Sequence, residues 1–314
     1  MILSGNKKKL FFLILFFIFN TKIIFALDNE IVIKIDNAII TKIDIQNEIR
    51  YLKALNPNLK NLDEKEIYLI SKNSLLREKI KELEIYKYID EISIERKYLD
   101  SLIKARYTNL DFNKKEIFLD YLKTNMLEIK DIESKLSIEA TWNQLIYQKF
   151  SQNVKIDKIQ LKEKIRQDNS QKFKSYMLSE ILFNAINKKD LDEKYNKIIS
   201  SISNNGFENT ALSFSISDSS NIGGKLGWIK ESSLNEVIKK KLSFLSINQI
   251  TDPIFTPSGY LILKINDLKL IDKDYDQEKQ LKDLINYETN QQLNQFSNNY
   301  FKKIKNNFII NEIQ

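Results

Sequence analysis

Apolar and polar positions alternate at the start of the chain beyond residue 26. Ile31, Ile33 and Ile35 are separated by single residues, Val32 and Lys34. An Asp-Asn pair then precedes a second short apolar run at 38–40. This period of two predicts two strands joined by a turn. Thr41 with Asp44 forms a capping-box pattern, so we expect a helix from about Lys42 to Leu55 that stops before Pro57.

From Asp63 to about Phe173 the apolar residues recur at helical spacing, with charged residues between them. No Gly or Pro interrupts the chain between Pro57 and Gly206, which favours a bundle of several helices. The pattern predicts that the aromatic residues of this region lie mainly in the core rather than in a binding groove: Tyr86, Tyr88, Phe118, Tyr121 and Phe150.

The pattern changes at Tyr176. It predicts a strand in "YMLSEILFNA", a helix over 190–205 that ends at Gly206, a short helix in "FENTALSFS" and another helix over 234–245. The segment "QITDPIFTPSGYLILKIND" predicts a hairpin, and a charged helix over 276–305 follows. We therefore expect an α+β protein, mostly helical, with a mixed insert of about 90 residues.

The first 26 residues combine Lys7–Lys9, an apolar run from Leu10 to Phe19 and a small residue, Ala26. This is the layout of a secretory signal peptide, and the apolar run is short of the roughly 20 residues of a spanning helix. An uncleaved anchor over 10–26 is the less favoured alternative. The expected divisions are 1–26 signal peptide, 27–175 helical domain, 176–268 insert domain and 269–314 C-terminal helix packed on the helical domain.

Composition narrows the chemistry. The chain has no His and no Cys, which removes the commonest general base, thiol catalysis and the usual transition-metal ligands. Four of the 49 basic residues lie in the first 26, which leaves 45 against 42 acidic residues. Because the two signs are interspersed, we expect no nucleic-acid partner, and we expect no nucleotide, metal or cofactor either.

The stretch "SDSSNIGGKLGWI", a helix and "ITDPIFTPSGYLILKI" resemble the parvulin-type peptidyl-prolyl isomerases in order and spacing. The matching positions are Asp218, Gly223, Gly224, Leu226, Gly227, Trp228, Pro253, Thr256, Gly259 and Tyr260. The glycines are expected to permit positive-φ turns that set Trp228 and Ile229 into the core. With the opening segment "NAIITKIDIQNEIRYL", the whole mature chain resembles the SurA-type periplasmic chaperones with one parvulin domain.

The resemblance implies a site as well as a fold. Active parvulins carry a His on the first strand and one on the last, and here Glu180 and Leu261 fall at those positions. Asp218 is the nearest match to the family's Cys or Asp. The implied substrate cradle is Leu234, Ile238 and Phe244, although core packing is the favoured interpretation of each.

Because both histidines are absent, we expect weak or no isomerase activity. The leading hypothesis is a periplasmic folding chaperone for unfolded envelope proteins, above all outer-membrane β-barrel precursors. Two alternatives stay open: an active prolyl isomerase that uses Asp218, and a non-catalytic assembly adaptor in the envelope of a Gram-negative bacterium.

Overall fold

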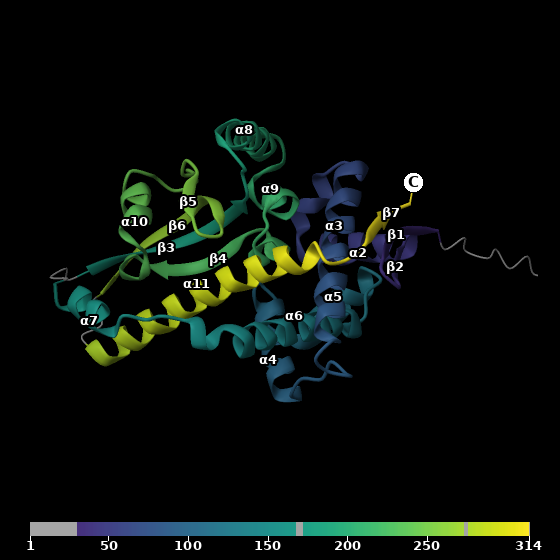
Figure 1. Ribbon diagram of the computed structural model, residues 1–314, viewed down its shortest axis with the longest axis horizontal. Helices are drawn as coiled ribbons and strands as arrows, with labels where there is room; N and C mark the ends of the chain where they lie inside the picture. The colour runs from purple at the N-terminus through teal and green to yellow at the C-terminus, as the bar shows by residue number, and fades with distance from the viewer. Residues whose placement is uncertain (1–29, 168–171, 273–275, 314) are drawn as a thin grey trace, which may run out of the picture.

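The computed structural model describes residues 30–167, 172–272 and 276–313. Two parts lie along the length of the molecule, one built on a sheet and the other a helical bundle. The long helix α11 (Gln277–Lys305) runs beneath the sheet part and reaches into the bundle (Figure 1). One part is a four-stranded sheet with helices, and the other is a helical bundle with a three-stranded sheet. The expected α+β class is confirmed. The expected signal peptide lies outside the described residues.

The N-terminal segment folds as its pattern predicts. Strands β1 (Ile31–Ile35) and β2 (Ala38–Thr41) pair antiparallel, with Asp36 at φ 49° in the turn. Helix α2 (Lys42–Leu55) begins with the predicted capping box, in which the Thr41 backbone amide donates to the Asp44 carboxylate at 2.8 Å. This confirms the helix and its start, and places Ile33, Ile35 and Ile45 in the core.

The rest of the bundle consists of helices whose apolar faces meet in two clusters of buried residues. They are α3 (Glu64–Ile85), α4 (Arg96–Thr108), α5 (Lys115–Thr124) and α6 (Ile129–Phe150), with short 3₁₀ turns η1 (Pro57–Asn61) and η2 (Ser151–Asn153). Helix α7 (Lys158–Gln167) follows and packs against α11 in a separate cluster. Phe118 is fully buried, and Tyr121 and Phe150 pack against the core. The prediction was wrong for Tyr86 and Tyr88, which follow the last turn of α3 and are 47% and 52% exposed.

The four-stranded sheet has the order β4-β3-β6-β5 and is antiparallel throughout. Its strands are β3 (Lys172–Phe183), β4 (Lys225–Lys230), β5 (Ile254–Thr256) and β6 (Gly259–Asp272). Successive residues of a strand point to opposite faces. Consequently Leu182 and Leu261 face one core, whereas Ile181 and Ile262 face another.

Different helices cover the two faces. Helices α8 (Lys188–Asn205) and α9 (Phe207–Phe214) cover the face of Ile181, and α10 (Glu236–Ser243) covers the face of Leu182. The predicted stop of α8 is confirmed, since Gly206 is its C-cap at φ 81°. The short turns η3 (Asp218–Ile222) and η4 (Glu231–Ser233) flank β4.

Helix α11 ties the two parts together. Its first half carries Leu284, which packs with Leu161 and Ile165 of α7, and Tyr287, which packs against the sheet core. Its second half carries Tyr300 and Phe301, which pack against Trp142 of α6. The chain then forms β7 (Ile310–Glu312), which pairs with β1 and which the sequence pattern did not predict. Among the described residues, no helix is both long and apolar enough to cross a membrane.

The glycine-rich stretch forms the tight return from η3 into β4. Gly223, Gly224 and Gly227 all have φ between 70° and 77°, a region that residues with a side chain rarely adopt. Ile229 is buried as predicted, but Trp228 is 40% exposed, so its predicted place in the core was wrong. Neighbouring strand residues face opposite sides, and Lys269 lies over the exposed indole ring at 3.9 Å.

We expect Gly224→Ala to destabilise the protein far more than Gly227→Ala. Both glycines have a backbone φ in the left-handed region, so each substitution carries a backbone cost of roughly 1–2 kcal/mol. Only at Gly224 would the added Cβ also meet the Glu180 carbonyl oxygen, at 2.2 Å, whereas nothing lies within 4 Å at Gly227. Urea unfolding of the two variants measures the difference. Equal losses would contradict a steric role for Gly224.

Candidate peptide-binding site

Two of the predicted site residues, Glu180 and Leu261, lie on the β3–β6 face that α10 covers. Glu180 of β3 is opposite Leu263 of β6, and Leu261 is two pairs further along, opposite Leu182. All four side chains therefore point to the same side of the sheet. Leu261 is only 8% exposed and packs in the core, so it brings no polar group to this face.

Glu180 is held by the loop before the glycine stretch. The hydroxyls of Ser217 and Ser219 donate to its Oε1 at 2.5 and 2.8 Å. Burial raises the pKa of this carboxyl above its ordinary value, the nearby charge of Asp218 adds to the rise, and the two hydroxyls oppose it. The sequence singled out Glu180, but it gave no sign that these two serines would be its partners.

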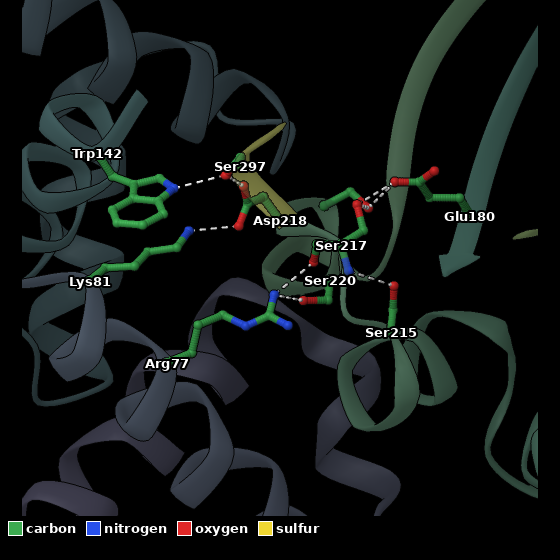
Figure 2. Close-up of polar contacts among 10 residues, drawn as sticks. Arg77, Lys81, Trp142, Glu180, Ser215, Ser217, Asp218, Ser220 and Ser297 are labelled. Atoms are coloured by element: carbon green, nitrogen blue, oxygen red, sulfur yellow. Dashed lines mark hydrogen bonds and ion pairs between the residues drawn. The ribbon is translucent and has the colours of Figure 1, made fainter. Parts of the chain in front are cut away.

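Asp218 points away from Glu180 and toward the helical bundle (Figure 2). Its Oδ1 accepts from Lys81 Nζ of α3 at 2.6 Å, and its Oδ2 accepts from Ser297 Oγ of α11 at 3.1 Å. Ser297 Oγ in turn accepts from the indole N–H of Trp142 at 2.8 Å. Three elements, η3, α3 and α11, thus meet at one carboxylate, and Ser297 connects it to α6.

The same loop has a second contact with α3. Arg77 Nη1 donates to the Ser217 carbonyl at 2.9 Å and to Ser220 Oγ at 3.3 Å. Burial would raise the pKa of Asp218, but the charges of Lys81 and Arg77 overcome it and hold that pKa below its ordinary value. Burial lowers the pKa of Arg77, and the charge of Asp218 offsets part of this fall. The two neighbouring carboxyls, Glu180 and Asp218, therefore shift in opposite directions.

The predicted cradle residues do not form one surface. Leu234 is 2% exposed and belongs to the sheet core, and Ile238 packs partly against it. Phe244 lies just beyond the end of α10 and is 76% exposed. Ile238 also lines a cavity of about 670 Å³ between α7, α10 and α11, whose opposite wall includes Tyr287.

Two further cavities flank the contact between the parts. One of about 380 Å³ lies between α3, α9, η3 and α11, and one of about 300 Å³ lies between α4, α6, η3 and α11. Asp218 and Ser219 line the second. Within the described ranges, no three carboxylates gather as a metal site. Because the chain has no His and no Cys, neither an imidazole nor a thiol is present here for proton transfer.

Residues 179–267 match the family described as the rotamase PPIC-type peptidyl-prolyl isomerase domain. Chaperone SurA of Pseudomonas aeruginosa is 33% identical over 61 residues, 19% of this chain and 15% of that protein. Chaperone SurA of Buchnera aphidicola is 33% identical over 96 residues, 31% of this chain and 22% of that protein. The aligned parts thus span less than a quarter of either chaperone.

Among solved structures, one reported for a SurA-like chaperone of Campylobacter jejuni is 16% identical to this chain. It covers 91% of this chain and 100% of its own, with a TM-score of 0.35.

We expect Lys81→Met to lower the free energy of unfolding by about 3 kcal/mol, because it leaves the Asp218 carboxylate without its ion-pair partner in a site with little access to water. The side chains of Lys81 and Asp218 are 6% and 26% exposed. Lys79→Met is the matched control: it lies on the same helix with Glu82 at 2.6 Å, but its side chain is 35% exposed. An exposed pair contributes about 0–1 kcal/mol. Similar losses in urea unfolding would contradict the distinction.

We expect Glu180→Gln to stabilise the protein at pH 7 and to lose this effect in acid. A folded pKa above the ordinary value means that folding disfavours the ionised carboxyl, so stability falls as pH rises through that pKa. Gln keeps an acceptor for Ser217 and Ser219 without the charge. Unfolding of the variant and of the native chain, measured across pH 3 to 8, checks the sign. The expectation is contradicted if the stability of the variant minus that of the native chain is lower at pH 7 than at pH 4.

Proposed function

We propose that this chain, whose residues 179–267 form a PPIC-type domain and which is similar to SurA-type chaperones, binds unfolded polypeptides and keeps them from aggregating. Its site of action is the periplasm of a Gram-negative bacterium, reached through the signal-like residues 1–26. Its clients are envelope proteins, above all outer-membrane β-barrel precursors. The division into residues 27–175, 176–268 and 269–314 stays part of this proposal.

One observation supports binding over catalysis. At the positions of the family histidines, Glu180 is bonded to two serine hydroxyls and Leu261 is in the core. The loop carboxylate, Asp218, is bonded to Lys81 and Ser297 of the helical part. The domain keeps its scaffold, but its polar groups connect it to the bundle. We therefore propose weak or absent isomerase activity.

Exposed apolar groups supply a surface for clients. Phe255 of the edge strand β5 is 75% exposed, Val237 of α10 is 60% exposed, and Phe244 is 76% exposed. A client strand can also pair with the backbone of an edge strand, which tolerates many sequences. The alternating aromatic strands of a β-barrel precursor fit both modes. Such contacts need no energy source.

We expect the chain to suppress light scattering by an unfolded β-barrel protein at near-stoichiometric ratio. Replacing both Phe244 and Phe255 by Ser should raise the amount needed severalfold, since it removes exposed apolar surface. Ile159→Ser on α7 is the control, because Ile159 is 82% exposed but lies on another element. No suppression by the native chain would overturn the proposal, and a docking adaptor would give that result.

The same preparation is then assayed for isomerisation of a proline-containing tetrapeptide. We expect a rate close to the uncatalysed one, because the chain can only stabilise a twisted amide by an apolar environment. A catalytic constant near that of active parvulins would overturn the view that binding is the main activity.

A further inference from the structure

The cavity of about 380 Å³ has apolar walls from three segments distant in sequence. Helix α3 contributes Ile70 and Leu76, α9 contributes Leu212 and Phe214, and α11 contributes Phe301. Phe214 is 38% exposed at the end of α9, so part of this wall is open to solvent. The cavity can therefore take an apolar side chain without rearranging the core.

The polar lining of this cavity is cationic. Arg77, Lys302 and Lys305 line it, and among the residues that line it there is no Asp or Glu. The charge of Asp218 acts on Arg77. Lys302 and Lys305, by contrast, have no ion pair with any residue that the structure describes, and both are exposed. Two ammonium groups beside apolar walls are thus left for a ligand.

Uncharged donors complete the lining. Asn73, Asn184, Asn221 and Asn298 bring side-chain amides, which can bond to a peptide backbone as donors and acceptors. Helix position alone accounts for lysines near the C-terminus of α11, where the helix dipole favours cations. It does not account for the lack of any carboxylate in the lining. Lys303 lies in the same turn but outside the cavity, so the cavity has two of the three lysines of this turn.

We propose that this cavity binds an internal segment of an unfolded polypeptide in which an Asp or Glu neighbours an apolar side chain. The carboxylate lies between Lys302 and Lys305, and the apolar neighbour packs on Phe214 and Phe301. Internal carboxylates recur along a client, whereas a chain has one C-terminus, so the internal segment suits a chaperone of many clients. This inference rests on the proposed function and names the segment it prefers.

The test uses two ten-residue peptides, acetylated and amidated, that carry a fluorophore. One has two Glu residues beside Phe and Leu, and the other has Gln in their place. We expect the Glu peptide to bind the native chain about fivefold more tightly at low salt, the size of one or two exposed ion pairs. The preference should shrink as ionic strength rises.

Variants locate the effect. Lys302→Gln combined with Lys305→Gln should abolish the preference, whereas Lys303→Gln, the same charge change in the same turn, should keep it. Phe214→Ala should weaken the binding of both peptides to the same extent. Equal binding of the two peptides by the native chain, or the same loss in Lys303→Gln, would overturn the inference.

Two controls separate the other possibilities. If the Gln peptide with a free C-terminus binds more tightly than the amidated Gln peptide, while the amidated Glu peptide binds no more tightly than the amidated Gln peptide, the cavity takes chain ends, which also overturns the inference. If the native chain shows no preference yet still suppresses scattering by an unfolded β-barrel protein, this inference fails and the proposed function stands. If it shows the preference but suppresses no scattering, the proposed function fails instead.

Discussion

The ion pair between Lys81 and Asp218 fixes how the two parts of this protein meet. Its atoms are 2.6 Å apart, and the Lys81 side chain is almost fully removed from water. A charge in such a place is costly without its partner, so separating α3 from η3 is unfavourable unless water reaches both groups. Ser297 and Trp142 extend the contact to α11 and α6. One carboxylate therefore bonds to α3, near the start of the chain, and to α11, near its end.

This contact also explains the chemistry of the sheet face. The loop from Ser217 to Ser220 bonds to two elements. Its Ser217 and Ser219 hydroxyls bond to Glu180 of β3, whereas the Asp218 carboxylate and the Ser217 carbonyl bond to α3. With Asp218 turned to the bundle, the two carboxyls are not joined by a proton. Glu180 is destabilised as an anion, and Asp218 is stabilised as one. A loop that serves docking in this way has few polar groups left for work on a prolyl bond.

Local signals were enough to predict most of the elements but not their contacts. The capping box of α2 and the glycine stop of α8 depend on residues within one turn, and both were predicted from sequence. Strand β7 was missed because its three residues are short of any periodic pattern and pair with β1, far away in sequence. Lys81 was missed for a related reason. In a chain with 49 basic residues, nothing local distinguishes the one that meets Asp218, 137 positions away.

Trp228 and Phe244 show a finer limit. The family resemblance identified both positions, but a residue type does not say which side of a strand it faces or where a helix ends. Trp228 falls on the side opposite Ile229, and Phe244 falls one residue after Ser243, the last of α10, so both side chains are exposed. Exposure of this kind is costly for a protein with no partner and useful for one that binds apolar clients.

A chaperone without an energy source must release its clients by equilibrium alone, which favours several weak contacts over one strong one. The surfaces proposed for clients fit this requirement because they lie on different elements: exposed phenylalanines near α10 and β5, and a cationic cavity between α3, α9 and α11. The cavity differs from the exposed surface in one respect. Its walls belong to segments whose spacing depends on the Lys81–Asp218 pair, so a client there binds a geometry that this pair maintains. Affinity at the cavity and the stability of the contact between the two parts are then linked, and each should rise or fall with the other.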